Sequence, residues 1–175
     1  MSTINVQLGA TYSVSKSATA AHVESYKAAA KFINASPDEV ELYISQLNLV
    51  LNATQISIGV STTQLLHNLS TALDFQPGDE LIISKLNHEA NSAPWVRVAE
   101  RMGLQVKWWG ADHATNPTCG VEDLKSLLSE KTRIVACPHA SNITGTITDV
   151  KAIAGAVHQS PRVCLALRES LDADR

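Results

Sequence analysis

The sequence has few cysteines, and none of them lies in a pattern that holds a metal or a disulfide framework. Cys119, Cys137 and Cys164 are the only three, they are widely spaced, and no CxxC pair is present. An odd number of scattered cysteines argues against a disulfide-stapled secreted fold and against a zinc site, and it is typical of a reducing compartment. We therefore expect a cytoplasmic protein.

Charge of one dominant sign and long apolar runs are also lacking. The net charge is −3 and only 18% of the residues are charged. Without clustered lysine and arginine there is no basic surface for nucleic acid or for a membrane. No apolar run approaches the roughly 20 residues that a membrane helix needs, and the N-terminus lacks the pattern of a signal peptide. These absences exclude nucleic acid and membrane as expected partners.

What remains is the composition of an ordinary globular domain, with 175 residues of which 45% are hydrophobic. Residues 1–17 are polar and rich in small residues, which predicts a loop, and the alanine-rich residues 18–34 have the spacing of a helix. Residues 41–58 are rich in leucine, isoleucine and valine without a clean period. They fit two strands, or one strand and a short helix.

From about residue 56 onward, strands and helices alternate. Short apolar runs predict strands at 81–83, 104–109, 133–137 and 162–167, with helices at 61–73, near 96–102, at 121–128 and after Asp149. Such alternation favours an α/β fold with a mainly parallel sheet that is covered by helices on both faces, a three-layer αβα arrangement.

The helix predicted at 61–73 begins with hydroxyl side chains. Ser61 is followed three residues later by Gln64, which is the pattern of a capping box. Thr62 and Thr63 then lie in a first turn whose backbone N–H groups have no partner within the helix, and such a turn attracts anions. Two interpretations are open: the hydroxyls only cap the helix, or they also bind a phosphate.

The segment 78–95, GDELIISKLNHEANSAPW, predicts a turn, a buried strand, a polar loop and the start of a helix that Gly103 ends. His88 lies in the polar loop. A lone loop histidine is often a surface residue without a role, but loops at the carboxyl ends of parallel strands are where α/β proteins hold ligands.

Three such loops are predicted to meet at one edge of the sheet. That edge would gather Thr62, Thr63, His88, Asn91, His139, Asn142 and Thr144. The set offers hydroxyls, imidazoles and amides, but it contains no paired carboxylates and no lysine beside a base. It predicts a site that binds a phosphorylated, planar ligand and is incomplete as a catalytic site.

Four segments resemble the class V aminotransferase and cysteine desulfurase family, whose members depend on pyridoxal phosphate. They are GATYSVSKSATAAH, STTQLLHNLSTAL, GDELIISKLNHEANSAPWVRVAERMGLQVKWW and LLSEKTRIVACPHASNITGTITDVKAIAGAVH, in the family's order. The resemblance implies the pyridoxal-phosphate-dependent transferase fold. It also implies that residues 1–175 are part of its large, cofactor-binding domain.

The resemblance also implies roles for individual residues. Thr62 and Thr63 match the pair that holds the phosphate of pyridoxal 5'-phosphate, and His88 matches the histidine that stacks on the pyridine ring. Asn142 matches the asparagine near the ring hydroxyl, whereas Asn91 is expected to order the loop. The intact family acts on amino-acid substrates, and a homodimer is a further expectation.

The departures from the family pattern concern the catalytic groups. The aspartate that pairs with the pyridine nitrogen and the Schiff-base lysine have no counterpart at a matching position, and Lys125 and Lys151 match nothing catalytic. We expect the family's small C-terminal domain to be absent from these 175 residues, and about fifteen residues between 41 and 56 exceed the family pattern. These features indicate a fragment with no catalytic residue of its own.

The alternatives are a non-catalytic module that pairs with a full-length subunit, or a flavodoxin-like or Rossmann-like nucleotide binder. The last is disfavoured because no GxGxxG motif follows a strand.

Overall fold

The computed structural model describes residues 6–32, 59–110, 117–159 and 163–168, which fall into two compact units divided after Ile58. The first unit contributes one helix, α1 (Ser13–Phe32), and the second contains every other described element. The expectations for residues 41–58, for the charged tail and for the start of the loop at 110–118 lie outside the described residues. Within the described residues, no helix is long and apolar enough to cross a membrane.

Helix α1 begins five residues earlier than its sequence predicts, at Ser13 rather than at position 18. Hydroxyl side chains, which make this stretch resemble a loop in the sequence, form hydrogen bonds with the backbone that precedes the helix. The Ala10 N–H donates to Ser15 Oγ at 2.9 Å, and the Gly9 N–H donates to Thr19 Oγ1 at 3.0 Å. Serine and threonine side chains favour such local bonds at helix starts. The prediction of a loop up to residue 17 was therefore wrong for residues 13–17.

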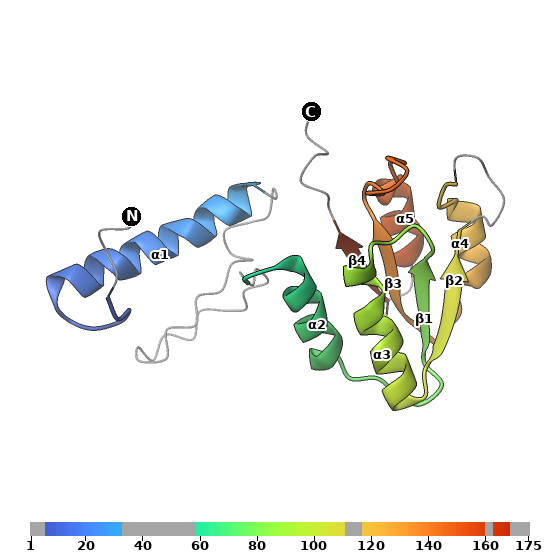
Figure 1. Cartoon of the computed structure of the whole chain (residues 1–175), viewed down its shortest axis with the longest axis horizontal. Coiled ribbons are helices and arrows are strands. Elements are labelled where there is room, and N and C mark those ends of the chain that lie inside the picture. The colour runs from blue at the N-terminus through green and yellow to red at the C-terminus, as the bar shows by residue number, and fades with distance from the viewer. Residues whose placement is uncertain (1–5, 33–58, 111–116, 160–162, 169–175) are drawn as a thin grey trace. The chain divides into compact units, whose positions relative to one another are not determined.

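The second unit is built on a parallel sheet of four strands in the order β2-β1-β3-β4 (Figure 1). The strands are β1 (Glu80–Ser84), β2 (Gln105–Trp109), β3 (Thr132–Pro138) and β4 (Cys164–Arg168). Every pairing is parallel, and consecutive strands are joined through helices. The strands predicted from the apolar runs are confirmed, and each boundary lies within two residues of the prediction.

Helices cover both faces of this sheet. On one face, α2 (Thr62–Ala72) and α3 (Ala93–Met102) bury Leu66, Trp95 and Val98 against Leu81 and Ile83. On the other face, α4 (Val121–Leu127) and α5 (Val150–Val157) enclose a second core (Figure 1). Its members are Ile82, Trp109, Cys119, Leu124, Val135, Cys137, Ile153 and Val157. The alternation of Leu81, Ile82 and Ile83 between the cores follows from the two-residue period of a strand. The expected three-layer αβα fold is confirmed.

Helix ends follow the predicted signals. Ser61 caps α2 by accepting a hydrogen bond from the Gln64 N–H at 3.2 Å, and Asp149 caps α5 by accepting from the Ala152 N–H at 3.0 Å. Gly103 ends α3 with a φ of 69°, a left-handed conformation that glycine adopts at little cost. The chain therefore enters and leaves these helices where its own residues direct it.

A polar cluster ties the amino ends of the strands together. The Glu80 carboxylate is only 7% exposed and accepts hydrogen bonds from Lys107 Nζ at 2.6 Å and from Ser129 Oγ at 2.5 Å. Burial by itself raises the pKa of Glu80. The hydrogen bonds from Lys107 and Ser129 and the nearby lysine charges outweigh this effect and hold its pKa below the ordinary value of 4.5. This cluster lies at the end of the sheet opposite to the carboxyl-end loops.

Candidate functional site

The loop that leaves β1 is held in place by a buried amide. Asn91 is fully buried; its Nδ2 donates to Asn87 Oδ1 and to the Cys137 carbonyl, each at 3.3 Å. Its Oδ1 accepts a hydrogen bond from Trp95 Nε1 at 3.1 Å. One side chain thus joins the β1 loop, the carboxyl end of β3 and the first turn of α3. The expectation that Asn91 orders this loop is confirmed.

His88 is oriented by the same loop. It is half-buried and precedes the short 3₁₀ helix η2 (Glu89–Asn91), where its Nδ1 accepts a hydrogen bond from the Ala90 N–H at 3.0 Å. This bond fixes the plane of the imidazole, and in the neutral ring it leaves the proton on Nε2. The ring is therefore held in one orientation at the carboxyl edge of the sheet.

The first turn of α2 presents free backbone donors. The Gln64 N–H is used by Ser61 Oγ and the Leu65 N–H by the Ser61 carbonyl. The N–H groups of Thr62 and Thr63 have no partner in the part of the chain that the structure describes. Two unpaired donors at the positive end of a helix dipole suit an anionic oxygen.

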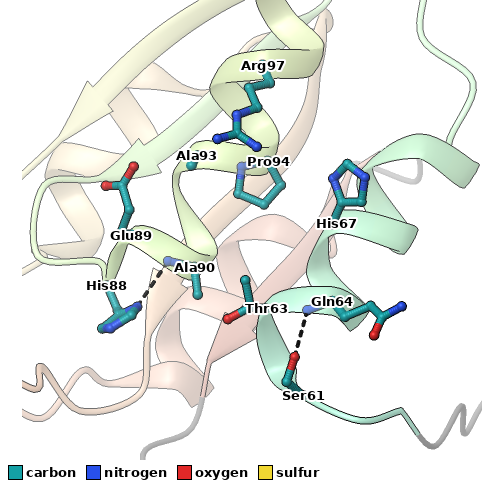
Figure 2. Close-up of a pocket in the computed structure, with 10 residues that line it drawn as sticks. All are labelled: Ser61, Thr63, Gln64, His67, His88, Glu89, Ala90, Ala93, Pro94 and Arg97. Carbon is teal, nitrogen blue, oxygen red and sulfur yellow. Dashed lines mark hydrogen bonds between the residues drawn. The ribbon is translucent and has the colours of Figure 1, made fainter.

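A cavity of about 570 Å³ lies between α2, η2 and α3, and it brings Thr63 and His88 together (Figure 2). Its lining residues are Ser61, Thr63, Gln64, His67, His88, Glu89, Ala90, Ala93, Pro94 and Arg97. The volume lies within the range of small-molecule and cofactor sites. Thr63 and His88 are 25 positions apart in the sequence. Both line the cavity because the start of α2 and the loop after β1 lie at the same end of the helix layer formed by α2 and α3.

Thr62 and Asn142 do not line this cavity. Both are exposed, and Asn142 lies in a turn between β3 and α5 that Ser141 stabilises by accepting hydrogen bonds from the N–H groups of Ile143 and Thr144, both at 3.4 Å. Because β1 and β3 are neighbouring parallel strands, the turn carrying Asn142 leaves the same sheet edge as the loop carrying His88. The structure therefore brings together two of the four residues predicted for the site.

Sequence reasoning did not place His67, Glu89 or Arg97 in the site, and it assigned the lining residues Ser61 and Gln64 only to a helix cap. The spacing of His67 and Arg97 can be recognised only once the cavity is known. His67 follows Thr63 by four residues on α2, and Arg97 follows Ala93 by four on α3, so each repeats one helical face a turn later. Glu89 is the neighbour of His88.

The described residues support neither a reactive cysteine nor a metal site. Burial raises the pKa of Cys137 to about 12, and burial also raises the pKa of Cys119, against which a hydrogen bond with Ser84 acts. Neither thiol is therefore a thiolate at neutral pH. No group of three or more histidine, cysteine or acidic residues is placed to hold a metal ion in the described ranges.

The comparison with protein families decides the ancestry of the chain. Residues 3–167 match the family model of aminotransferase class-V. The chain belongs to the class V aminotransferase family. It is 47% identical over 163 residues to the aminotransferase-like protein FGM3 of Gibberella zeae, which covers 93% of this chain and 37% of that protein. It is 36% identical over 138 residues to the cysteine desulfurase-like protein ustD of Aspergillus flavus, covering 75% of this chain and 28% of that one. The chain thus spans less than half the length of these relatives.

Solved structures of a cysteine desulfurase and of C-DES share the fold. The apo cysteine desulfurase of Thermococcus onnurineus NA1 superposes with a TM-score of 0.75 at 19% identity, over 94% of this chain and 37% of that chain. A C-DES variant with glycine covalently linked to its PLP cofactor superposes with a TM-score of 0.67 at 20% identity, over 89% of this chain and 38% of that chain. The expected membership in the pyridoxal-phosphate-dependent transferase fold is confirmed.

The cavity fits part of a pyridoxal phosphate molecule. The open N–H groups and the Thr63 hydroxyl suit a phosphate, and an imidazole held in one plane suits the face of a pyridine ring. A carboxylate for the pyridine nitrogen is not found in β4, whose five residues, CLALR, contain no acid. The described residues therefore offer hydrogen-bond donors that suit a phosphate and an imidazole that suits one ring face.

Proposed function

We propose that this chain is the cofactor-binding segment of a class V enzyme of the cysteine desulfurase or aminotransferase type that acts on an amino acid. The observation that carries the proposal is the cavity in which Thr63, at the start of α2, and His88, after β1, line one space. Pyridoxal phosphate, when bound, supplies an electron sink for reactions at the α-carbon of an amino acid. The role of the chain is to bind and orient that cofactor.

Each proposed residue has one task. Thr62 and Thr63 hold the phosphate through their backbone N–H groups and hydroxyls, and His88 covers one face of the ring. Asn142, from the neighbouring loop, approaches the ring hydroxyl. The hydrogen bond from the Ala90 N–H to His88 Nδ1 supports this assignment, because it occupies Nδ1 and holds the imidazole in one orientation.

We propose further that these 175 residues do not perform the covalent chemistry by themselves. Within the described part of the chain the cavity lining contains no lysine, the residue that forms the Schiff base in the family. The segment therefore binds the cofactor without a covalent bond. A location in the cytoplasm belongs to the same proposal.

The alternative is a non-catalytic module that pairs with a second copy or with a full-length subunit. The observation that favours pairing is the sheet, in which β2 and β4 each have one neighbouring strand among the described elements. Strand edges with free backbone groups promote association. Co-purification of a tagged 175-residue chain with an untagged full-length class V protein supports the module, and elution of the chain alone contradicts it.

Binding of pyridoxamine 5'-phosphate to the 175-residue chain tests the main proposal. Calorimetry should give a dissociation constant at least about tenfold lower for this compound than for pyridoxamine, which lacks the phosphate. Thr63→Val should reduce that difference, whereas Thr71→Val, an exposed threonine of the same helix outside the cavity, should leave it unchanged. Equal affinities for the two compounds would contradict a phosphate site at α2.

A further inference from the structure

Arg97 is a cavity residue with no assigned task. It lies on the second turn of α3, and its side chain folds back along the helix toward Ala93 and η2 (Figure 2). The guanidinium makes no hydrogen bond and no ion pair with any residue that the structure describes. An arginine carries five N–H donors and keeps its charge at every physiological pH. The cavity therefore contains a permanent cation with unused donors.

The surroundings of Arg97 do not neutralise it. Glu89 also lines the cavity, but no ion pair joins the two side chains, and Glu89 is exposed to solvent. His67, from α2, lies on the opposite wall and faces Pro94 (Figure 2). Two basic side chains from two helices thus flank the end of the cavity that lies away from Ser61.

The cavity is longer than a phosphate site requires. On α2 its lining runs from Thr63 to His67, and on α3 it runs from Ala93 to Arg97. Four residues of α-helix rise by about 6 Å, so the lining continues roughly one helical turn beyond the free N–H groups of α2. A ligand whose phosphate lies at Thr63 can carry a second anionic group at the height of Arg97.

We propose that Arg97 binds a carboxylate of the amino-acid substrate while the cofactor phosphate lies at the start of α2. The planar fork of a guanidinium matches the two oxygens of a carboxylate, whereas an unpaired ammonium would offer only a point charge. This inference rests on the proposed function, because it needs the phosphate at Thr63. In the family resemblance the substrate-binding arginine lies in the small C-terminal domain, so Arg97 is a separate contact supplied by these residues.

Two probes that differ by the amino acid test this role without catalysis. Pyridoxamine 5'-phosphate carries the phosphate and the ring, and N-(5'-phosphopyridoxyl)-L-alanine, a stable reduced conjugate, adds one carboxylate. With the 175-residue chain, Arg97→Ala should raise the dissociation constant of the conjugate about tenfold and leave that of pyridoxamine 5'-phosphate unchanged. Arg97→Lys, which keeps the charge but loses the fork, should give an intermediate loss.

The matched control is Arg101→Ala, which removes the same charge from the same helix one turn later, at a position that is exposed like Arg97 but lies outside the cavity. It should change neither dissociation constant. If both probes bind and Arg97→Ala weakens them equally, or weakens neither, the carboxylate role of Arg97 is overturned and the phosphate site stands. If neither probe binds the unaltered chain, the proposed function and this inference fall together.

Discussion

At the scale of single residues, Asn91 is the side chain on which the β1 loop depends most. Its amide is fully buried and forms hydrogen bonds with Asn87, Cys137 and Trp95. Removing it leaves buried partners without a bond, and each such group costs about 1–3 kcal/mol. The loop that carries His88 is therefore stabilised by a residue, Asn91, that does not itself line the cavity.

Asn91→Ala should lower the free energy of unfolding by about 2–4 kcal/mol, because a packed amide and its bonds are lost together. Urea denaturation of the variant and the unaltered chain measures the change. Asn142→Ala is the control, since Asn142 is exposed and its loss should alter stability by less than about 0.5 kcal/mol. Equal destabilisation by both substitutions would show that the Asn91 network does not stabilise the fold.

Glu80 gives the fold a dependence on pH. Its pKa in the folded state lies below the ordinary value of 4.5, so its contribution to stability is fully present above pH 4.5. The contribution is lost as the pH falls from that value through the lowered pKa, because the carboxylate must then be protonated. Lys107 and Ser129 lose an anionic partner in the same window.

Glu80→Gln should therefore flatten the loss of stability below pH 4.5 and lower stability at pH 7. Thermal melting of both proteins between pH 3 and pH 7 measures the two slopes. Glu122→Gln is a suitable control, because Glu122 forms its ion pair with Lys125 on the exposed surface of α4. Parallel pH profiles for Glu80→Gln and the unaltered chain would contradict this assignment.

At the scale of elements, helix α5 shows how much a cap decides. Asp149 accepts a hydrogen bond from the Ala152 N–H, and its charge lies at the positive end of the helix dipole. Asp149→Ala should cost about 1 kcal/mol of unfolding free energy, and Asp149→Asn, which keeps the acceptor, should cost less. Urea denaturation distinguishes them. If alanine and asparagine were equivalent, the hydrogen bond would not be the stabilising contact.

The elements that the sequence predicts well are those with unambiguous local signals. Apolar runs mark β1 and β3, Ser61 and Asp149 mark helix starts, and Gly103 marks a helix end. Helix α1 starts before its predicted position because serine and threonine favour loops and helix starts alike, and only the hydrogen bonds decide between them.

The cavity was predictable only in part, because local sequence patterns do not determine how two helices pack against each other. Parallel strands determine the edge at which their loops meet, so His88 could be expected near the start of α2. The packing of α2 against α3 is a tertiary contact, and no local pattern shows which face of each helix the neighbour leaves open. Arg97 and His67 became visible as lining residues only once both helices were in place.

At the scale of the whole molecule, we expect the cofactor to bind without a covalent bond. Within the described ranges no lysine lines the cavity. Borohydride reduction of the 175-residue chain with pyridoxal phosphate should therefore give only scattered, substoichiometric lysine adducts, because exposed amines react weakly with any aldehyde. Peptide mass spectrometry measures this. One stoichiometric adduct on a single lysine would contradict the prediction.

We propose that one cavity between α2, η2 and α3 binds the phosphate and the ring of pyridoxal phosphate together. A crystal structure of the 175-residue chain with pyridoxamine 5'-phosphate tests it most directly. We expect the phosphate within hydrogen-bonding distance of the Thr62 and Thr63 N–H groups, and the pyridine ring stacked on His88. A ligand bound elsewhere, or a phosphate at α2 with the ring turned away from His88, would contradict it.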